Sequence, residues 1–354
     1  MIRGILVFIS VLFLAVPADA KSWKKVFEGV LRESAQKGVM FGHHDDTMYG
    51  YTWRYDNSDR SDTKDVVGLY PAMMSFDLSD IDKGTRNRTE YERMRVEIRK
   101  QHARGGFVTI SWHATNLLTG KNAWDVSTQN TIRSVLPNGA KAQAFLSCLD
   151  NLADFFKSLK DAEGQPIPVI FRPWHECNGT WFWWGSNQCT SKEYKALWKL
   201  MVKHLAKKGV GNVIYAYSPG DNIRTDEDFL ERYPGDKIIS VFGVEGYAIR
   251  TTGSDADRKS FIARIRRSFD VVAPLALQRN KILAFTETGT KFNSDTQWWT
   301  KALLPAIEGY PVCFLVTWRN ATKDDNECFG VYPGHPSEAD FKRFAADSRI
   351  IFRK

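Results

Sequence analysis

Eight short apolar or β-branched runs recur along the chain. They are Val39–His44, Ala72–Leu78, Phe107–His113, Val169–Glu176, Val213–Ser218, Ile238–Tyr247, Ile282–Glu287 and Val312–Trp318. Most of these runs are continuous rather than alternating, which is typical of strands that are buried on both faces. The pattern therefore predicts eight β-strands.

Helical periodicity fills several of the intervals between these runs. Apolar residues repeat at spacings of three and four in Phe145–Phe156, Tyr194–Leu205 and Phe261–Phe269, and Trp23–Val30 suggests a leading helix. Thr190 and Glu193 predict a capping box at the start of the second of these helices. Ser294 and Gln297 predict a similar box before a helix over Trp298–Leu304.

Strands that alternate with helices predict an α/β fold, here a single (β/α)8 TIM barrel. No repeat, low-complexity tract or Pro/Ser-rich linker interrupts the pattern, so we expect one catalytic barrel domain over residues 21–354. A doubly wound open sheet is the alternative, but no glycine-rich phosphate-binding loop follows any of the predicted strands.

Residues 1–20 have the pattern of a secretory signal peptide. Arg3 precedes an apolar stretch over residues 4–17, and residues 18–20, Ala-Asp-Ala, form a small-residue cleavage pattern. The apolar stretch is too short for a membrane span, and no other run is long enough for one. We therefore expect cleavage near Ala20 and a secreted or periplasmic protein with no membrane span.

Composition and charge change this picture only slightly. The 354 residues are 43% hydrophobic, which is enough for a sizeable core, and their formal net charge is +8. The basic residues are scattered, so we expect a solvated surface and no nucleic-acid partner. No long apolar patch suggests an obligate partner, and we expect a monomer. The 12 tryptophans exceed what core packing usually needs, and a sugar- or peptide-binding cleft would use them.

Five cysteines are too few for a disulfide scaffold. Cys148 and Cys313 lie in apolar patterns and are predicted to be buried thiols. Cys177 and Cys189 bracket a tryptophan-rich loop. They could form a disulfide that stabilises the protein by about 3 kcal/mol, or they could remain two thiols.

Polar and aromatic residues gather where the predicted strands end. The endings are His43-His44-Asp45-Asp46, Phe76-Asp77, Ser111-Trp112-His113, His175-Glu176, Tyr217-Ser218, Glu245-Gly246-Tyr247, Thr286-Glu287 and Trp318-Arg319. In barrels of this type the active site lies at the carboxyl ends of the strands. One polar ending is common in any protein, but eight in register indicate a functional site.

Two glutamates, Glu176 and Glu287, end the fourth and seventh strands, which face each other across a closed barrel. Paired carboxyls beside exposed indoles suit the cleavage of a glycosidic bond. We predict Glu176 as the acid/base, because the indoles of segment 172–185 would raise its pKa, and Glu287 as the nucleophile. Tyr247 could donate a hydrogen bond that keeps Glu287 ionised. A surface salt bridge is the alternative role for either glutamate alone.

His113 and His175 are predicted to donate to sugar hydroxyls or to pair with the glutamates, with a structural histidine as the alternative. No metal is predicted. His43 and His44 are adjacent, so their rings face opposite sides of a strand. No HExxH motif and no cluster of thiolates occurs.

Trp181 and Trp318 are the predicted stacking platforms for a sugar, and Arg319 could bind hydroxyls beside Trp318. One or two of the other tryptophans in the loop that holds Trp181 are expected to pack inward. Trp198 lies on a helical face and is predicted to be part of the core.

These motifs together resemble the β-mannanases of glycoside hydrolase family 26, which are retaining (β/α)8 glycosidases. The resemblance covers roughly residues 39–319 and is highly specific as a combination. It rests on Phe41-Gly42-His43, Ser111-Trp112-His113, Phe171-Arg172-Pro173-Trp174-His175-Glu176, Trp181-Phe182-Trp183-Trp184-Gly185, Gly246-Tyr247, Thr286-Glu287 and Thr317-Trp318-Arg319-Asn320.

The resemblance implies hydrolysis of β-1,4-linked mannose in mannan, glucomannan or galactomannan by double displacement, with no cofactor. It implies the same roles for Glu176 and Glu287, and His175 matches the family's histidine before the acid/base. The positions that match the lining of the subsites next to the scissile bond are His113, Trp181, Tyr247, Trp318 and Arg319.

Three positions depart from the family pattern. Cys177 stands where methionine is frequent, Glu245 stands where aspartate is common, and Thr288-Gly289 follows the nucleophile where the pattern varies. The departure at Cys177 should be harmless. The other two leave the detail of the subsites open.

Other activities remain open on the same scaffold. An exo-acting enzyme would release mannobiose from chain ends if a long loop such as Asp46–Asp65 blocked one end of the cleft. A β-glucan or β-1,3-xylan hydrolase would differ in its recognition of the sugar 2-hydroxyl. A non-catalytic carbohydrate-binding barrel is a further alternative, which the presence of both glutamates disfavours.

Overall fold

A computed structural model describes residues 20–354 except 55–58, 83–87, 249–251, 292–294 and 322–326. The predicted signal peptide lies outside the described residues, apart from Ala20, where the first helix begins. Ser294 of the second predicted capping box and part of the loop Asp46–Asp65 also lie outside them.

Eight parallel strands close into a barrel. They are β1 (Val39–His44), β3 (Met73–Asp77), β4 (Phe107–Trp112), β5 (Val169–Pro173), β6 (Val213–Tyr217), β7 (Ile239–Glu245), β8 (Ile282–Thr288) and β9 (Val312–Thr317). Each pairs in parallel with the next, and β9 pairs with β1, so the barrel has no free edge. Every predicted run therefore corresponds to one barrel strand, and the predicted (β/α)8 barrel is confirmed.

Two further strands lie outside the barrel. β10 (Ile350–Arg353) pairs in parallel with β1, and β2 (Tyr70–Pro71) pairs antiparallel with β10. Neither was predicted, because such short strands carry no periodicity that sequence alone can detect. They attach the carboxyl-terminal segment beside β1.

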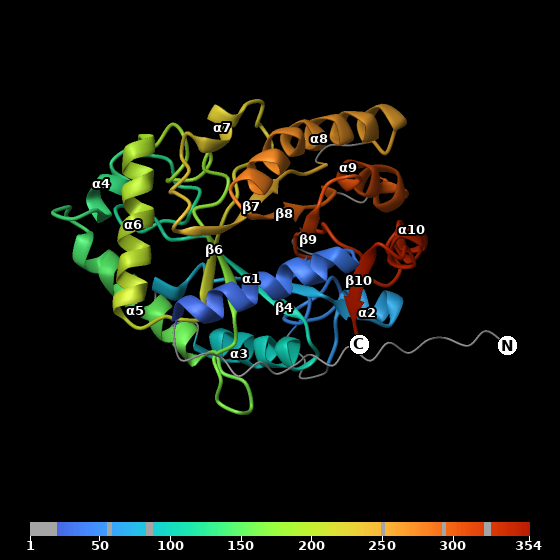
Figure 1. Cartoon of the computed structure of the whole chain (residues 1–354), viewed down its shortest axis with the longest axis horizontal. Helices are drawn as coiled ribbons and strands as arrows, with labels where there is room; N and C mark the ends of the chain where they lie inside the picture. Colours follow the sequence, from blue (N-terminus) through green and yellow to red (C-terminus); the bar gives the residue numbers. More distant parts are fainter. Residues whose placement is uncertain (1–19, 55–58, 83–87, 249–251, 292–294, 322–326) are drawn as a thin grey trace.

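Helices surround the barrel (Figure 1). They are α1 (Ala20–Lys37), α2 (Asp62–Val67), α3 (Arg88–Ala103), α4 (Thr131–Val135), α5 (Ala142–Ser158), α6 (Ser191–Lys207), α7 (Asp226–Leu230), α8 (Asp255–Gln278), α9 (Leu304–Ile307) and α10 (Glu338–Ala345). The predicted helices correspond to α1, α5, α6 and α8. The helix predicted over Trp298–Leu304 is a π-helical turn, Trp299–Leu303, that continues into α9.

The capping box of α6 is confirmed. The side chain of Thr190 accepts a hydrogen bond from the backbone N–H of Glu193, and the Glu193 carboxylate accepts one from the Thr190 N–H. This reciprocal pair satisfies backbone donors that the first turn of a helix leaves without partners. The cap fixes the residue at which the tryptophan-rich loop ends and α6 begins.

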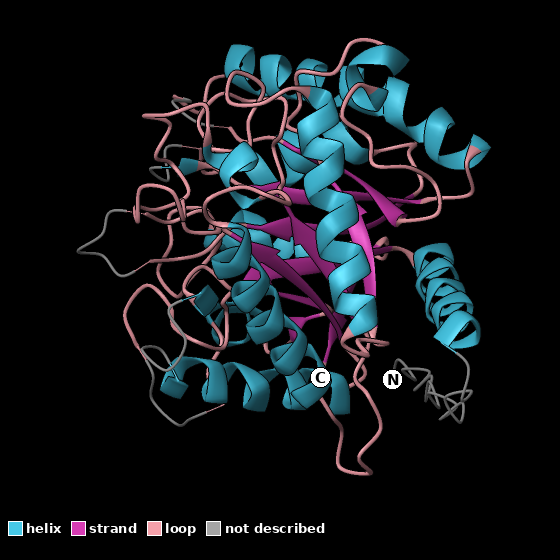
Figure 2. Ribbon diagram, turned by 90° about the vertical axis from the view of Figure 1, so that its left-hand side faces the viewer, coloured by secondary structure: helices cyan, strands magenta, loops and turns pink. Residues whose placement is uncertain are grey.

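Helix α1 closes the amino-terminal end of the barrel. Its Phe27 and Leu31 pack in one apolar cluster with interior residues of the strands, among them Met40, Ile170 and Phe314. Figure 2 shows long loops gathered on the side of the strands away from α1. The two ends of the barrel are therefore built differently: one is sealed by apolar side chains, and the other carries the loops.

All five cysteines are free thiols, so Cys177 and Cys189 are two thiols rather than a disulfide. Cys148 and Cys313 are buried, as predicted, and so is Trp198. Within the described part of the chain, no helix combines the length and the apolar character that a membrane crossing requires.

Candidate active site

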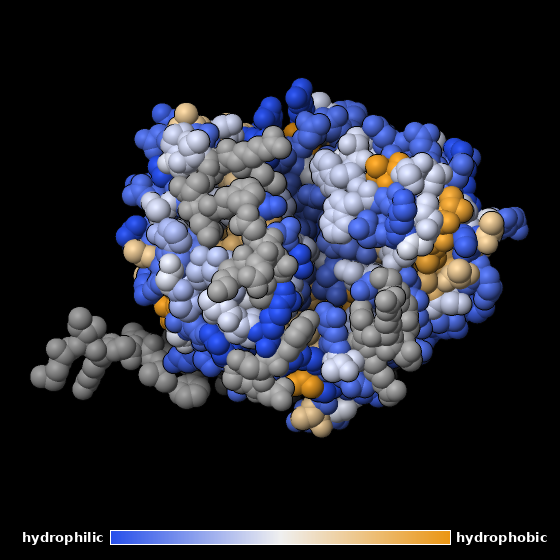
Figure 3. All heavy atoms as spheres, turned by 180° about the vertical axis from the view of Figure 1, so that it is seen from behind, coloured by the Kyte–Doolittle hydropathy of each residue, from blue (hydrophilic) through white to orange (hydrophobic). Residues whose placement is uncertain are grey.

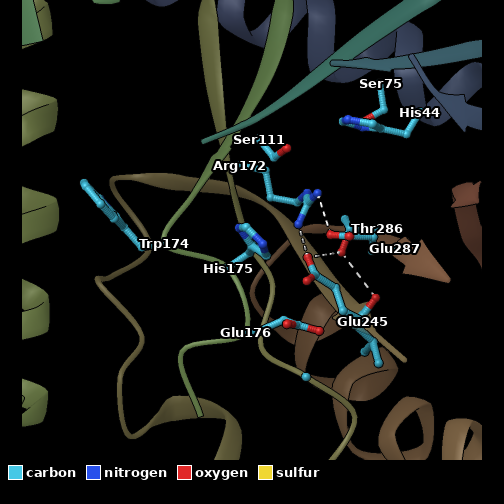
Figure 4. Close-up of polar contacts among 12 residues, drawn as sticks. His44, Ser75, Ser111, Arg172, Trp174, His175, Glu176, Glu245, Thr286 and Glu287 are labelled. Atoms are coloured by element: carbon cyan, nitrogen blue, oxygen red, sulfur yellow. Dashed lines mark hydrogen bonds and ion pairs between the residues drawn. The ribbon is translucent and has the colours of Figure 1, made fainter. Parts of the chain in front are cut away.

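The carboxyl ends of the barrel strands meet on the side opposite α1. Seen from that side, the surface is hollowed by a groove that runs between two lobes (Figure 3). Glu176, Glu245 and Glu287 lie close together in this region, as the close-up in Figure 4 shows. The strand endings that the sequence singled out therefore converge at one place.

The backbone after β5 turns sharply and places Glu176 at the site. Trp174 and Glu176 have φ angles of 54° and 50°, in the left-handed region that residues with a side chain rarely adopt. Such strain costs of order 1–3 kcal/mol for each residue and persists only where surrounding contacts impose it. β5 therefore ends at Pro173, earlier than the predicted end at Glu176.

Four hydrogen bonds hold this turn. The Tyr194 hydroxyl donates to the Trp174 carbonyl at 2.7 Å, and Trp184 Nε1 donates to the His175 carbonyl at 2.7 Å. The Glu176 N–H donates to the Ser218 carbonyl at 2.8 Å, and the Gly179 N–H donates to the Glu176 carbonyl at 2.9 Å. Side chains from a helix and a loop thus fix the backbone that carries the Glu176 side chain.

The half-buried Glu176 has the raised pKa that a general acid needs. Burial, and then the negative charge of Glu287, raises the pKa of Glu176 to about 7. The Trp181 indole opposes this in part, because its Nε1 donates a hydrogen bond of 2.7 Å to Glu176 Oε2. Glu176 can therefore donate a proton near neutral pH.

Glu287 reaches the interior of the barrel through an irregularity in β8. The register between β7 and β8 shifts after Val244, so that Glu245 lies opposite Glu287. Phe285, two residues earlier, packs in the layer between the barrel and the helices. Strict alternation would place Glu287 on that same outer side, and the irregularity turns it inward.

A fully buried arginine lies between the two glutamates of β7 and β8. Arg172 Nη2 forms an ion pair of 2.8 Å with Glu287 Oε2, and Nη1 pairs with Glu245 Oε1 (Figure 4). Thr286 Oγ1 donates to Glu245 Oε1 at 3.2 Å. Burial lowers the pKa of Arg172, but the charges of Glu245 and Glu287 outweigh it, so the guanidinium stays charged.

Tyr247 donates a hydrogen bond of 2.5 Å to Glu287 Oε1, as predicted. Burial, and then the charge of Glu287, raises the pKa of Tyr247 well above its ordinary value. The phenol therefore remains a donor, and Glu287 has one oxygen on Tyr247 and the other on Arg172. This arrangement fixes one orientation of the carboxylate.

The role of Arg172 and Glu245 was missed by sequence reasoning. An arginine inside the apolar run of β5 and a glutamate at the end of β7 were the available signals. One ligand atom from each of His175, Glu245 and Glu287 lies within 4.8 Å of the others, a spacing that could suit a metal ion. The Arg172 guanidinium already pairs with both carboxylates, so it supplies the positive charge that a metal ion would otherwise bring to this cluster.

Two histidines line the site beside the glutamates. His113 Nε2 and His175 Nε2 are 3.2 Å apart, and the Asp77 carboxylate accepts from His113 Nδ1 at 2.8 Å. Trp124, which is 53% exposed, stacks on His113 with ring centroids 5.0 Å apart and planes at 16°. Sequence reasoning missed Trp124, because it lies in the loop after β4 and not at a strand end.

The tryptophans of the loop after β5 divide as expected. Trp181 is 45% exposed, whereas Trp183 and Trp184 are buried. Trp183 Nε1 donates to the Ala114 carbonyl at 2.8 Å, which ties the loop after β5 to the loop after β4. The buried pair therefore anchors the loop and leaves the Trp181 ring available to a ligand.

The last two predicted residues follow β9. Trp318 is half-buried and stacks on His44 with centroids 3.9 Å apart, and its centroid lies 5.6 Å from that of His113. Trp318 thus shares the site with the histidines. Arg319 is held by an ion pair of 2.7 Å between its Nη2 and Glu327 Oε2, a partner that the sequence did not indicate.

Comparisons with known proteins agree with this geometry. The family model described as glycosyl hydrolase family 26 matches residues 16–290. A mannan endo-1,4-β-mannosidase of Bifidobacterium adolescentis is 31% identical over 343 residues, which are 91% of this chain and 34% of that protein. This chain therefore spans about a third of the length of that relative.

Two solved structures are similar over most of the chain. A GH26 β-mannanase of Bacteroides ovatus has a TM-score of 0.87 at 42% identity, and the match covers 93% of this chain and 94% of that one. An endo-β-1,4-mannanase of Cellulomonas fimi, solved as a double mutant, has a TM-score of 0.83 at 34% identity, with coverage of 95% and 76%.

Proposed function

The chain belongs to glycosyl hydrolase family 26, and on that premise we propose that it is a retaining endo-β-mannanase. Its substrates would be mannan, glucomannan or galactomannan, and it would cleave their β-1,4-mannosidic linkages. The names of its similar relatives support this substrate class. The observation that carries the mechanism is the pair Glu176 and Glu287, two carboxyls in contrasting surroundings at one site.

In the first step, a carboxylate oxygen of Glu287 attacks the anomeric carbon, and the bond from that carbon to the glycosidic oxygen breaks. Glu176 gives its proton to the departing oxygen. In the second step, Glu176 takes a proton from water, and the water oxygen displaces Glu287 from the anomeric carbon. Two inversions restore the β configuration, and both carboxyls return to their starting states.

The remaining predicted residues have supporting roles in this proposal. Trp181 and Trp318 present aromatic faces on which a pyranose ring can stack. Tyr247 and Arg172 hold Glu287 in position for in-line attack. We further propose that residues 1–20 direct secretion and that the mature chain acts as a monomer. Sequencing the amino terminus of the exported protein and measuring its mass in solution test these two points.

Product analysis on linear mannan, galactomannan, β-glucan and β-1,3-xylan tests the substrate class. We expect mixed manno-oligosaccharides from the mannans, and loss of this activity in Glu176→Ala and Glu287→Ala. Mannobiose alone from the outset would instead indicate an exo-acting enzyme. Cleavage of only β-glucan or xylan would contradict the proposed substrate.

Azide rescue distinguishes the two carboxyls. With an aryl manno-oligoside that has a good leaving group, Glu176→Ala should still form the glycosyl-enzyme, and azide should then give the β-glycosyl azide. In Glu287→Ala, azide takes the place of the nucleophile and should give the α-glycosyl azide. The opposite pair of products would reverse the two assignments.

A further inference from the structure

Asp77, at the end of β3, is surrounded by hydrogen-bond donors. Its carboxylate accepts from the Ser111 hydroxyl at 2.5 Å, from the Ser79 hydroxyl, and from the His113 backbone N–H at 3.3 Å. It also accepts from the His113 ring Nδ1 at 2.8 Å. Burial raises the pKa of Asp77, but the charge of His113 and these hydrogen bonds outweigh it and lower the pKa. Asp77 is therefore a carboxylate.

The other ring nitrogen of His113 faces His175. The two Nε2 atoms are 3.2 Å apart, so one of them must carry the proton of this hydrogen bond. Asp77 accepts from Nδ1 of His113, which fixes a proton there. Two states with a neutral His175 satisfy these conditions, and they differ in the charge of His113 and in the tautomer of His175.

In the first state, His113 is an imidazolium that donates from Nε2 to His175 Nε2. His175 is then neutral and carries its own proton on Nδ1. In the second state, His113 is neutral and its Nε2 accepts from a proton on His175 Nε2. His175 Nδ1 is then an acceptor. The charge of His113 therefore decides whether His175 Nδ1 is a hydrogen-bond donor or acceptor.

The charged groups around the pair favour the first state. Burial lowers the pKa of His113, but the charge and hydrogen bond of Asp77, and then the charge of Glu287, raise it overall against the opposing charge of Arg172. Burial, and then the charges of His113 and Arg172 with a smaller part from His44, lowers the pKa of His175 well below its ordinary value, although Asp77 opposes this. One imidazolium and one neutral imidazole result.

A ring contact supports the same state. Trp124 lies nearly parallel to the His113 imidazole, with planes at 16° and centroids 5.0 Å apart. The face of an indole attracts a cation that lies over it. An imidazolium at His113 is thus stabilised on its ring face by Trp124 and at Nδ1 by Asp77.

We propose that Asp77 is a positioning residue of the site, which holds His113 as an imidazolium and thereby fixes His175 as the tautomer with its proton on Nδ1. A ring nitrogen of His175 lies within 4.8 Å of carboxylate oxygens of Glu245 and Glu287. The imidazolium also adds positive potential at Glu176. Asp77 thus acts on the glutamates through two histidines. The kinetic consequence rests on the proposed function, but the protonation states do not.

Nitrogen-15 NMR of histidine-labelled protein tests the protonation states without any substrate. At neutral pH, we expect His113 to be protonated on both ring nitrogens and His175 on Nδ1 alone, with assignments from His113→Asn and His175→Asn. In Asp77→Asn, the titration of His113 should move down by about one pH unit or more. Asp154→Asn removes the same charge from an exposed position on α5 and should leave the titration unchanged.

A wild-type spectrum with the proton of His175 on Nε2 would overturn the proposal. That spectrum decides the tautomer even where Asp77→Asn fails to fold. An unchanged titration of His113 in folded Asp77→Asn would overturn it equally.

Kinetics supply a readout that a merely structural role would not move. In the Glu176→Ala background, an aryl manno-oligoside with a good leaving group needs no acid, so its pH profile no longer reports Glu176. We expect kcat/KM for this substrate to fall on the alkaline side with a midpoint above 6.5, and Asp77→Asn should move the midpoint down by about one pH unit. If Asp77 only supported the fold, the rate would drop at every pH with the midpoint unchanged.

Discussion

The two ends of the barrel are built from the same strands and have opposite chemistry. On β5, the interior position Ile170 belongs to the apolar cluster under α1, whereas Arg172, two residues later, is a buried cation. On β7, Val241, Gly243 and Glu245 follow one another at intervals of two residues, and they change from the apolar cluster under α1 to a buried carboxyl group. Because residues two apart on a strand share a face, each strand changes from packing to chemistry within a few residues.

This difference separates stability from function. The amino-terminal end gains free energy from apolar burial and close packing. The carboxyl-terminal end instead buries Arg172 with Glu245 and Glu287, and the desolvation of such ions offsets most of their attraction. We therefore expect substitutions at the amino-terminal end to change stability alone, and substitutions at the charged end to change activity with or without stability.

Removal of Arg172, the cation between Glu245 and Glu287, should have the largest effect on the stability and activity of the charged end. Arg172→Met leaves Glu245 and Glu287 buried without the charge that balances them, so we expect a loss of about 3–5 kcal/mol in the free energy of unfolding. Activity should fall below detection, because Glu287 also loses its orientation. Denaturant unfolding and kcat/KM measure the two effects. Arg172→Lys retains the charge and should recover part of the stability, and equal stability of Arg172→Met and wild type would contradict this account.

A cavity at the opposite end should affect stability alone. Phe314→Ala removes a fully buried ring from the cluster under α1 and should cost about 3–5 kcal/mol in the free energy of unfolding. At temperatures where the variant is folded, kcat/KM should remain within about twofold of wild type. Leu277→Ala, at a side chain that is 84% exposed, is the matched control and should change stability by less than about 0.5 kcal/mol. A large fall in kcat/KM of folded Phe314→Ala would show that the two ends are coupled.

The amino-terminal end was the more predictable from sequence. Continuous apolar runs identify buried strands, and eight of them with intervening helices limit the fold to few alternatives. The candidate glutamates were identifiable because they follow such runs. The hydrogen bond from Tyr247 to Glu287 was also predicted, and both residues end neighbouring runs of the predicted pattern.

The rest of the charged end depends on contacts between distant segments and on local strain. Trp174 and Glu176 have a left-handed backbone that tryptophan and glutamate rarely adopt. Hydrogen bonds from Tyr194 and Trp184 to the backbone of this turn hold that conformation. The stacking of Trp124 on His113 and the pairing of Arg319 with Glu327 join residues whose side chains carry no periodic signal. Such pairs become visible only when the loops are placed.

The pH dependence of activity tests the charged end without any substitution. The acid form of Glu176 is the active form in the first step, so activity on mannan should be lost as the pH rises through about 7. The midpoint should be visible in kcat/KM, which reports the free enzyme. An aryl manno-oligoside with a good leaving group needs no acid in its first step, so its alkaline fall should no longer report Glu176 and should follow the titration of His113 instead. If the midpoint of kcat/KM on mannan lay near 4.5, the ordinary pKa of a glutamate, burial would not act on Glu176 as the structure implies.

The smallest expected effect isolates one hydrogen bond at the rim of the site. Trp181→Phe keeps an aromatic ring but removes the indole N–H that donates to Glu176 Oε2. That bond lowers the pKa of Glu176, so its loss should move the alkaline midpoint upward by about a few tenths of a pH unit. Trp181→Leu should give the same shift and also weaken the binding of polysaccharide, because it removes the ring as well. A shift only in Trp181→Leu would assign the effect to stacking and not to the hydrogen bond, since the two variants differ only in whether an aromatic face remains.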